Sequence, residues 1–345
     1  MFGNAGVLRE FSKPTVLAYA RARQPQSYLG LTLFPEQTTN ALTFEYFKGV
    51  NGLPIMASVQ AFGAEARQAS REGLDKISGG IPTIKRKIPL TGQALIALKR
   101  SGAGDIDFVR NTLYNDLDTM IDACLARVEK LRMDAVADGV ITLAENGVIM
   151  TVDYGVPAGN KEILAGVNLW SDAVNCNPVA DIQRWVDAVV NASGVKPTRA
   201  LTSSTVVSNM VKSANLRKQV FGDNGASRIL TVADVNALLG SLELPLIAAY
   251  DTKARMEAED GVITTVRLFN EKKFVLLPPS VLGDTLVGPT EESLMDPDVS
   301  AQETAGVYAI VYQEQEPPKT TTKAAISAIP TFPQADAVFQ AQVLA

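Results

Sequence analysis

The sequence predicts an α+β protein organised around one long helix. Between Asp105 and Ala137, apolar residues recur every three or four positions without an intervening Pro or Gly, which is the pattern of one helix face. Before and after this stretch, short apolar runs bounded by Gly and Pro indicate strands. Beyond residue 176, such runs alternate with short capped helices, which is typical of a compact α+β domain.

Composition excludes several classes of protein. The 345 residues are 46% hydrophobic, which is enough for about two domains with substantial cores. No apolar run reaches the roughly 18 residues of a transmembrane helix, and no signal peptide is recognisable, so a protein made in the cytoplasm is expected. Histidine is absent, which rules out Ser-His-Asp and Cys-His catalysis and the commonest zinc sites. The net charge of -5 argues against dedicated nucleic-acid binding.

The predicted helix at 105–137 would be about 50 Å long, which is enough to span a domain. A two-stranded coiled coil is the alternative, because the steps of the apolar stripe sum close to a heptad. Acidic residues dominate the first half of the helix, and Asp107, Asp118 and Asp122 project from one flank beside the stripe. This flank is either a solvated face or a docking strip for something basic.

Residues 1–32 form a basic, extended arm in this interpretation. The arm carries the cations Arg9, Lys13, Arg21 and Arg23 against one acid, Glu10. A short helix is expected around 16–22, between Pro14 and Pro25. An isolated segment of this kind buries little surface, so it should lie on something else; a frayed tail is the alternative.

A polar excursion follows the arm. Short strands are predicted at 31–34, 42–47 and 55–62. The next stretch has few large apolar residues and an excess of basic ones, which include Arg67, Arg71, Lys85, Arg86 and Lys87. Gly79-Gly80 marks a turn, and Ile84, Arg86 and Ile88 share one face of a strand that leads toward the long helix. Such a two-stranded excursion is marginal alone, so a neighbour should order it.

The rest of the chain is predicted from local signals. A strand pair at 140–152 turns at Glu145-Asn146-Gly147, and an irregular stretch runs on to 175. Helices are expected after the caps Asn177 and Ser203, and after a capping box at Thr231 and Asp234. Strands are expected at 199–202, 244–250, 262–269, 274–277 and 307–312, then a linker-like stretch at 317–322 and a closing strand at 339–344.

The polar clusters form no catalytic or metal-binding constellation. Glu257, Glu259 and Asp260 flank a hairpin turn and lack the ligand spacing of a calcium loop. The hydroxyl run at 202–205 has no histidine partner and no G-x-S-x-G elbow. Neither a P-loop nor a dinucleotide fingerprint occurs. We therefore predict no enzyme activity, no cofactor and no metal site.

In its order of parts, the chain resembles the major capsid protein E family of lambda-like tailed bacteriophages and prophages. The resemblance covers nearly the whole chain and rests on the segments 33–62, 84–87, 105–137, 247–250 with the Asp260-Gly261 hairpin, and 339–344. It implies a Hong Kong 97-like capsid fold. The implied parts are an N-terminal arm at 1–32, an extended E-loop at 55–98, a peripheral domain at 33–54, 99–175 and 323–345 with the spine helix at 105–137, and an axial domain at 176–322.

The resemblance also implies a structural function. Subunits would assemble as hexamers and pentamers into an icosahedral head around packaged double-stranded DNA, in a virion made in the bacterial host cytoplasm. The strands begin near Leu31 and leave no room for an attached scaffolding segment, so a separate scaffolding protein is expected. A portal protein is another expected partner, and a decoration protein is a further candidate. DNA would be a non-specific neighbour, because an acidic subunit avoids tight adhesion to it.

Each subunit of such a shell has to reach its neighbour. Our hypothesis is that the basic loop lies over the acidic flank of an adjacent spine helix. It pairs Arg67, Arg71, Lys85, Arg86 and Lys87 with Asp107, Asp118 and Asp122. The arm cations Arg9, Lys13, Arg21 and Arg23 are the other candidate contact residues. Exposed ion pairs contribute at most about 1 kcal/mol each, so they would set register more than affinity.

Three other interpretations remain open. An encapsulin nanocompartment has the same fold but holds a cargo enzyme. Neighbouring genes would distinguish the two: terminase and portal genes indicate a phage, whereas a gene for a cargo enzyme with a docking tail indicates a compartment. An enzyme that uses carboxylates alone would be revealed by a hydrolase screen of the unassembled protein. A tail or decoration protein would usually be smaller and lack the long helix.

Overall fold

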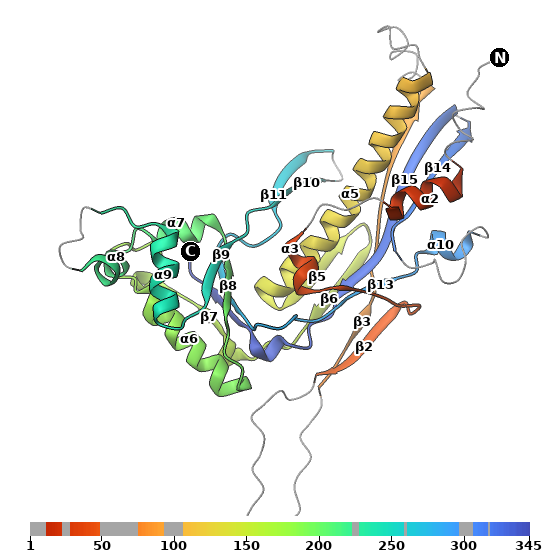
Figure 1. Ribbon diagram of the computed structural model, residues 1–345. Coiled ribbons are helices and arrows are strands. Elements are labelled where there is room, and N and C mark those ends of the chain that lie inside the picture. The colour runs from red at the N-terminus through yellow and green to blue at the C-terminus, as the bar shows by residue number, and fades with distance from the viewer. Residues whose placement is uncertain are drawn as a thin grey trace, which may run out of the picture. The chain divides into compact units, whose positions relative to one another are not determined.

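The computed structural model describes residues 12–22, 28–48, 75–92, 106–222, 228–258, 261–296, 306–316 and 318–345. They fall in two compact units (Figure 1). The first lies within Met1–Phe44, Gly79–Arg132 and Asp284–Thr331, and the second within Glu45–Ser78, Met133–Gly283 and Phe332–Ala345. The predicted E-loop and axial domain cut across these units, and the predicted domain boundaries remain a prediction.

The first unit contains a five-stranded sheet. Its strands are β1 (Glu36–Thr38), β4 (Thr83–Thr91), β13 (Thr285–Gly288), β14 (Tyr308–Gln315) and β15 (Pro318–Pro330). The order is β1-β13-β15-β14, and β4 also pairs with β15. Antiparallel ladders join β15 to β13, β14 and β4, whereas β1 runs parallel to β13. β15 is therefore the strand on which this sheet depends.

The linker predicted at 317–322 is wrong, because the chain from Pro318 onward is strand β15. Thr321 and Thr322 are buried there, and β-branched side chains pack well on a pleated surface. Pro318 is the first residue of the strand, a position that tolerates a missing N–H. Polar residues at the start of a buried strand thus give the same sequence pattern as a loop.

The long helix is α5 (Ile106–Asp138), one residue from the predicted bounds. Its predicted stripe is buried at Leu113, Leu117, Ile121, Cys124 and Val128. These side chains share one core with the sheet, which contributes residues of β4, β13, β14 and β15. Within the part of the chain that the structure describes, no helix is long and apolar enough to cross a membrane.

The N-terminal segment also packs on this unit. The predicted short helix is α2 (Lys13–Ala22), and its residues Val16 and Ala20 belong to the core that α5 forms with the sheet. The helix thus finds its apolar contacts within its own subunit. The strand predicted at 31–34 is wrong: this stretch is the helical turn α3 (Leu29–Leu33), which buries Gly30 and Leu33.

The second unit contains a sheet of order β7-β16-β12-β8-β9. Its strands are β7 (Lys161–Ile163), β16 (Phe339–Gln342), β12 (Lys273–Leu277), β8 (Arg199–Thr202) and β9 (Leu246–Ala249). The helices are α6 (Pro178–Ser193), α7 (Ser204–Met210), α8 (Ala214–Phe221) and α9 (Val232–Ser241). They pack on the sheet in a core that includes Trp170, Trp185 and Phe274.

Local signals predicted this unit well. The side chain of Asn177 caps α6, Gly194 ends that helix with a φ of 73°, and Ser203 caps α7. Thr231 and Asp234 form the predicted capping box at α9. The closing strand predicted at 339–344 is β16, which lies between β7 and β12.

The described structure also contains three two-stranded hairpins, one short α-helix, and 3₁₀ turns at Ala158–Asn160, Gly166–Asn168 and Ala335–Ala337. The hairpins are β2 (Thr43–Lys48) with β3 (Asp75–Gly80), β5 (Val140–Glu145) with β6 (Val148–Asp153), and β10 (Lys253–Glu257) with β11 (Ile263–Arg267). The β5–β6 turn uses positive φ angles at Asn146 and Gly147, as predicted. The short helix is α10 (Glu291–Met295). The strand predicted at 55–62 and the excursion up to residue 74 lie outside the described residues.

Candidate functional site

Strand β4 carries three of the predicted contact residues, and the structure gives each a different environment. Lys85 is bound inside its own subunit: its Nζ lies 2.7 Å from Glu291 Oε2 and 2.9 Å from Glu292 Oε1, both on α10. The hypothesis of a contact with a neighbouring copy did not foresee these partners. These two ion pairs connect strand β4 to α10, so the charge of Lys85 is already paired within its own subunit.

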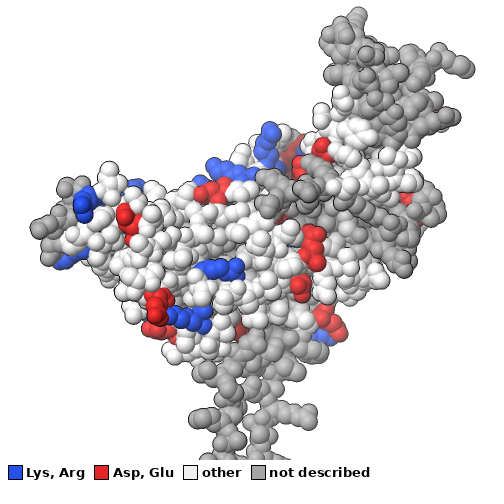
Figure 2. Space-filling model, viewed as in Figure 1, with Lys and Arg blue, Asp and Glu red and all other residues white. Residues whose placement is uncertain are grey.

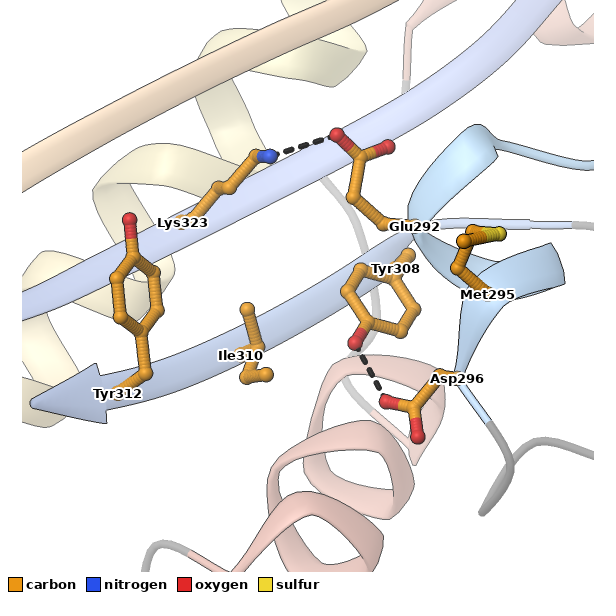
Figure 3. A pocket seen from close by; sticks show the side chains of 7 residues that line it. All are labelled: Glu292, Met295, Asp296, Tyr308, Ile310, Tyr312 and Lys323. Carbon is orange, nitrogen blue, oxygen red and sulfur yellow. Dashed lines mark hydrogen bonds and ion pairs between the residues drawn. The ribbon is translucent and has the colours of Figure 1, made fainter.

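The same carboxylate is shared with the central strand of the sheet. Lys323 Nζ on β15 lies 2.6 Å from Glu292 Oε1, and Figure 3 shows the two side chains meeting between strand and helix. They border a shallow hollow of about 280 Å³, whose other lining residues are Met295, Asp296, Tyr308, Ile310 and Tyr312. The Tyr308 hydroxyl donates to Asp296 Oδ2 at 2.6 Å. Four of the polar side chains that line the hollow thus bind one another in two pairs, while Glu292 Oε2 is buried without a hydrogen-bond partner in the described part of the chain.

The charges around α10 shift two pKa values. Burial alone would raise the pKa of Glu292, but hydrogen bonds from Lys323 and Lys85 outweigh it and lower the pKa to about 2. Burial would lower the pKa of Lys85, but its bonds to Glu291 and Glu292 raise it above the ordinary value. Among the described residues, no group of three or more His, Cys, Asp or Glu could hold a metal ion.

We expect Glu292 to make the stability of the first unit depend on acid pH. A free Glu side chain has a pKa of about 4.3. Because the folded-state pKa is about 2, the contribution of Glu292 is complete above about pH 5 and declines as the pH falls toward 2. Glu292→Gln should reduce the free energy of unfolding by about 1 kcal/mol at pH 6, and by less than about half of that at pH 3. Urea unfolding of both proteins at each pH measures this, and a pH-independent difference would contradict it.

Arg86 and Lys87 have surroundings that differ from those of Lys85 and from each other. Arg86 is exposed and lies on the strand face that it shares with Ile84 and Ile88. Burial raises the pKa of Cys124 on α5 to about 12, and the positive charge of Arg86 opposes that rise. Ile84 and Ile88 pack against the core beside Arg86, as predicted. Lys87 is exposed and pairs across the ladder with Lys323. Within the described ranges Lys87 has no ion-pair partner, so it is the β4 cation that remains available to another molecule.

The acidic flank of α5 is partly covered by the N-terminal segment of the same chain. The Tyr19 hydroxyl on α2 donates to Asp118 Oδ1 at 3.0 Å. Burial raises the pKa of Tyr28, and the charge of Asp122 raises it further. Asp118 and Asp122 are both half-buried. The flank is therefore neither a fully solvated face nor a fully open docking strip.

The remaining predicted contact residues cannot be placed. Arg9, Arg23, Arg67 and Arg71 lie outside the described residues. Lys13 and Arg21 lie on α2 and Asp107 on α5, but their side chains are likewise outside the description. The loop-to-spine hypothesis therefore stays a prediction.

Helix α5 also contains a buried charged cluster that its sequence pattern does not predict. Glu129 is fully buried and Arg132 is 3% exposed, although charged side chains are rarely buried unless they are paired. Glu129 Oε1 accepts the N–H of Gly30 at 2.9 Å. Arg132 Nη2 lies 3.0 Å from Glu36 Oε1, and its Nη1 lies 3.6 Å from Glu129 Oε2. The cluster thus attaches the segment around α3 and β1 to the long helix.

The cluster extends to strand β13. Arg132 Nε donates to Thr285 Oγ1 at 2.8 Å, and that hydroxyl donates to the carbonyl of Phe34 at 2.9 Å. A Cβ on Gly30 would stand 2.3 Å from Glu129 Oε2, so only glycine allows this close approach. One signal could have revealed the cluster. From Leu131 onward the helix is apolar on several sides, at Met133, Ala135, Val136 and Ala137, which indicates burial all round.

The sequence and the fold of this chain match those of known proteins. A profile described as Phage major capsid protein E matches residues 15–343. One similar structure is a protein assigned as the capsid protein of a prophage of E. coli CFT073, with a TM-score of 0.61 at 15% identity, covering 96% of this chain and 98% of that one. Another is a phage-related protein from Bordetella bronchiseptica RB50, with a TM-score of 0.52 at 14% identity, covering 95% and 96%. No curated protein sequence matches significantly. The two structures share the fold predicted from the sequence.

Proposed function

We propose that this chain, which belongs to the phage major capsid protein E family, assembles as hexamers and pentamers into the icosahedral head that encloses packaged double-stranded DNA. The observation that carries the proposal is the family match over residues 15–343. The shared fold of the prophage protein supports it. As a capsid protein, the chain is a structural component of the virion and not an enzyme. Its synthesis in the host cytoplasm is part of the proposal.

The electrostatics of the chain agree with a shell around DNA that does not bind it tightly. The net charge is -5, and on the face in Figure 2 the described basic and acidic side chains are interspersed, with no single basic patch. Tight binding of DNA would need a cluster of Lys and Arg on one face. Packaged DNA is therefore a non-specific neighbour in this proposal. The other partners are a portal protein, a separate scaffolding protein and, as a further candidate, a decoration protein.

Assembly itself tests the proposal. The chain is expressed alone and together with its neighbouring gene, and the products are viewed by negative-stain microscopy and sized by sedimentation. We expect closed particles of uniform diameter, with a neighbouring scaffold gene improving their uniformity. A chain that stays monomeric at high concentration under both conditions would contradict the proposal. Particles that copurify with an enzyme instead of DNA would indicate a nanocompartment.

We propose further that the basic loop contacts the acidic flank of a neighbouring spine helix. Among the described cations of the loop, Lys85 is bound to α10 and Arg86 interacts within its own chain, so Lys87 is the one to examine. On the acidic side, Asp118 and Asp122 are both half-buried and both interact within their own chain, Asp118 by accepting a hydrogen bond from Tyr19. Lys87 is therefore the residue to test.

Reversing the charge of Lys87 should weaken assembly without unfolding the subunit. Lys87→Glu is expected to raise the protein concentration needed for assembly about fivefold at low salt, because a contact of about 1 kcal/mol becomes repulsive. The effect should shrink at about 1 M salt, where exposed charges are screened. Light scattering against concentration measures it.

Two variants control this experiment. Lys87→Gln, which removes the charge without reversing it, should raise the threshold by less than Lys87→Glu does. Lys272→Glu changes an exposed lysine of the second unit and should leave the threshold unchanged. If Lys87→Glu assembles at the native concentration at low salt, the proposed contact is wrong even though the capsid role stands.

A further inference from the structure

The β10–β11 hairpin stands apart from the sheets of the described structure. Its two strands pair only with each other, from Lys253 opposite Arg267 to Glu257 opposite Ile263. Figure 1 shows the hairpin extending away from the sheet that contains β8 and β9. An isolated two-stranded hairpin is marginally stable in water, so a hairpin of this kind gains most from a partner that covers it.

One face of the hairpin is apolar. Residues on alternate positions of paired strands share a face. The ladder therefore places Ala254, Met256, Val266 and Thr264 together, and Val262 extends this face beside the turn. Met256 is 42% exposed and Val262 is 54% exposed. This face therefore exposes apolar surface to water. Covering it would stabilise a complex, because burial of apolar surface contributes about 25 cal/mol per Å².

The opposite face carries the charged residues of the hairpin. These are Lys253, Arg255 and Arg267 against Glu257, and they share the face with Thr265 and with Ile263, which is 58% exposed. Arg267 is held by Asp251 and by Glu271, whose Oε2 lies 3.2 Å from Arg267 Nε. Across the residues that the structure describes, Lys253 and Arg255 have no ion-pair partner. The hairpin thus exposes apolar side chains on both faces, and one of these faces also carries two available cations.

We propose that the β10–β11 hairpin docks on a second copy of this chain and forms part of the contact between subunits. The inference rests on the proposed function, which places many copies side by side. A second copy could cover the apolar face and also attract Lys253 and Arg255, because each copy carries a net charge of -5. A nucleic acid would satisfy the two cations and leave the apolar face in water. The pattern of the hairpin therefore favours a protein surface.

Site-specific labelling tests the inference. Both native cysteines, Cys124 and Cys176, are buried, so Met256→Cys introduces an exposed thiol that a maleimide dye can report. The labelling rate is measured on unassembled subunits and on purified particles. We expect labelling to be at least about tenfold slower in the particles, because opening of a packed contact limits access. Equal rates in subunits and particles would overturn the inference and leave the capsid role intact.

A paired set of variants measures the contribution of the apolar face. Met256→Ser with Val262→Ser should raise the assembly threshold about tenfold or more, because two contact residues are lost from the interface. The matched control is Val148→Ser with Ile149→Ser on the β5–β6 hairpin, which is 45% and 90% exposed at these positions. An equal rise for both double variants would overturn the inference.

Two further outcomes would also overturn it. Protection of the introduced thiol in unassembled Met256→Cys subunits upon addition of double-stranded DNA would assign the hairpin to nucleic acid. Failure of the native chain to form particles with its neighbouring gene would remove the proposed function and this inference together. Far-UV circular dichroism of each variant shows whether the subunit is folded before assembly is scored.

Discussion

Replacing Arg132 by alanine is expected to destabilise the folded chain by about 3–5 kcal/mol. The guanidinium is 3% exposed and binds Glu36 and Thr285 beside the fully buried Glu129. Its removal leaves the Glu129 carboxylate in the interior without the charge of Arg132, and the desolvation of an uncompensated charge is expensive. Urea unfolding followed by circular dichroism measures the loss.

Two comparisons separate charge from packing in this prediction. Arg132→Met with Glu129→Gln should recover most of the stability, because a neutral pair of similar volume leaves no buried charge. Arg127→Ala changes a half-buried cation on the same helix and should cost less than about 1 kcal/mol. A loss below about 1 kcal/mol for Arg132→Ala would show that the buried cluster does not hold the N-terminal segment.

Replacing Trp185 by alanine is the second large effect, expected to reduce stability by about 3–5 kcal/mol. The indole is fully buried in the second unit, stacked on Trp170 at 5.7 Å and on Phe339 at 5.4 Å between ring centroids. Its Nε1 donates to Glu162 Oε2 at 2.5 Å. The substitution opens a large cavity among α6, β12 and β16, and equilibrium unfolding in urea measures its cost.

The chain supplies a matched control and an optical probe for this experiment. Trp185→Phe keeps a six-membered aromatic ring in the stack but removes the N–H donor and the volume of the second ring, so it should cost about 1 to 2 kcal/mol, less than Trp185→Ala. Arg184 Nη1 still binds Glu162 at 2.7 Å, so the carboxylate keeps a partner. Both tryptophans of the sequence lie in this core, so their emission reports the second unit. Equal losses for the two variants would contradict the packing argument.

The sequence predicted most elements whose signals are local. α5 was predicted within one residue because its stripe is unbroken, and the caps of α6, α7 and α9 follow from single side chains. The start of β15 and the turn α3 were missed because long-range contacts decide them. Thr321 is a polar residue, yet it is buried in the folded chain. Gly30 lies in a helical turn, and its N–H donates a hydrogen bond to Glu129, which is distant in sequence.

The candidate contact residues were predictable as a charge pattern but not as partners. The excess of cations before α5 was visible in the sequence, yet Lys85 is bound to Glu291 of α10, at a separation of 206 positions. Asp118 likewise accepts a hydrogen bond from Tyr19, 99 positions earlier. The charge pattern of a sequence shows which side chains are charged. Only the fold shows which of them have ion-pair or hydrogen-bond partners within the subunit.

The position of β15 has a consequence for synthesis of the subunit on the ribosome. Strand β4 pairs with β15, which is synthesised much later. The hydroxyls of Thr83 and Ser327, for example, lie 3.0 Å apart although the residues are separated by 244 positions. The sheet of the second unit likewise needs β16, which lies between β7 and β12 and is the last of its strands to be synthesised. Because distant pairings form late, a chain interrupted before residue 318 lacks central strands of both sheets. Chains that end before residue 318 would then remain incompletely folded and open to proteolysis.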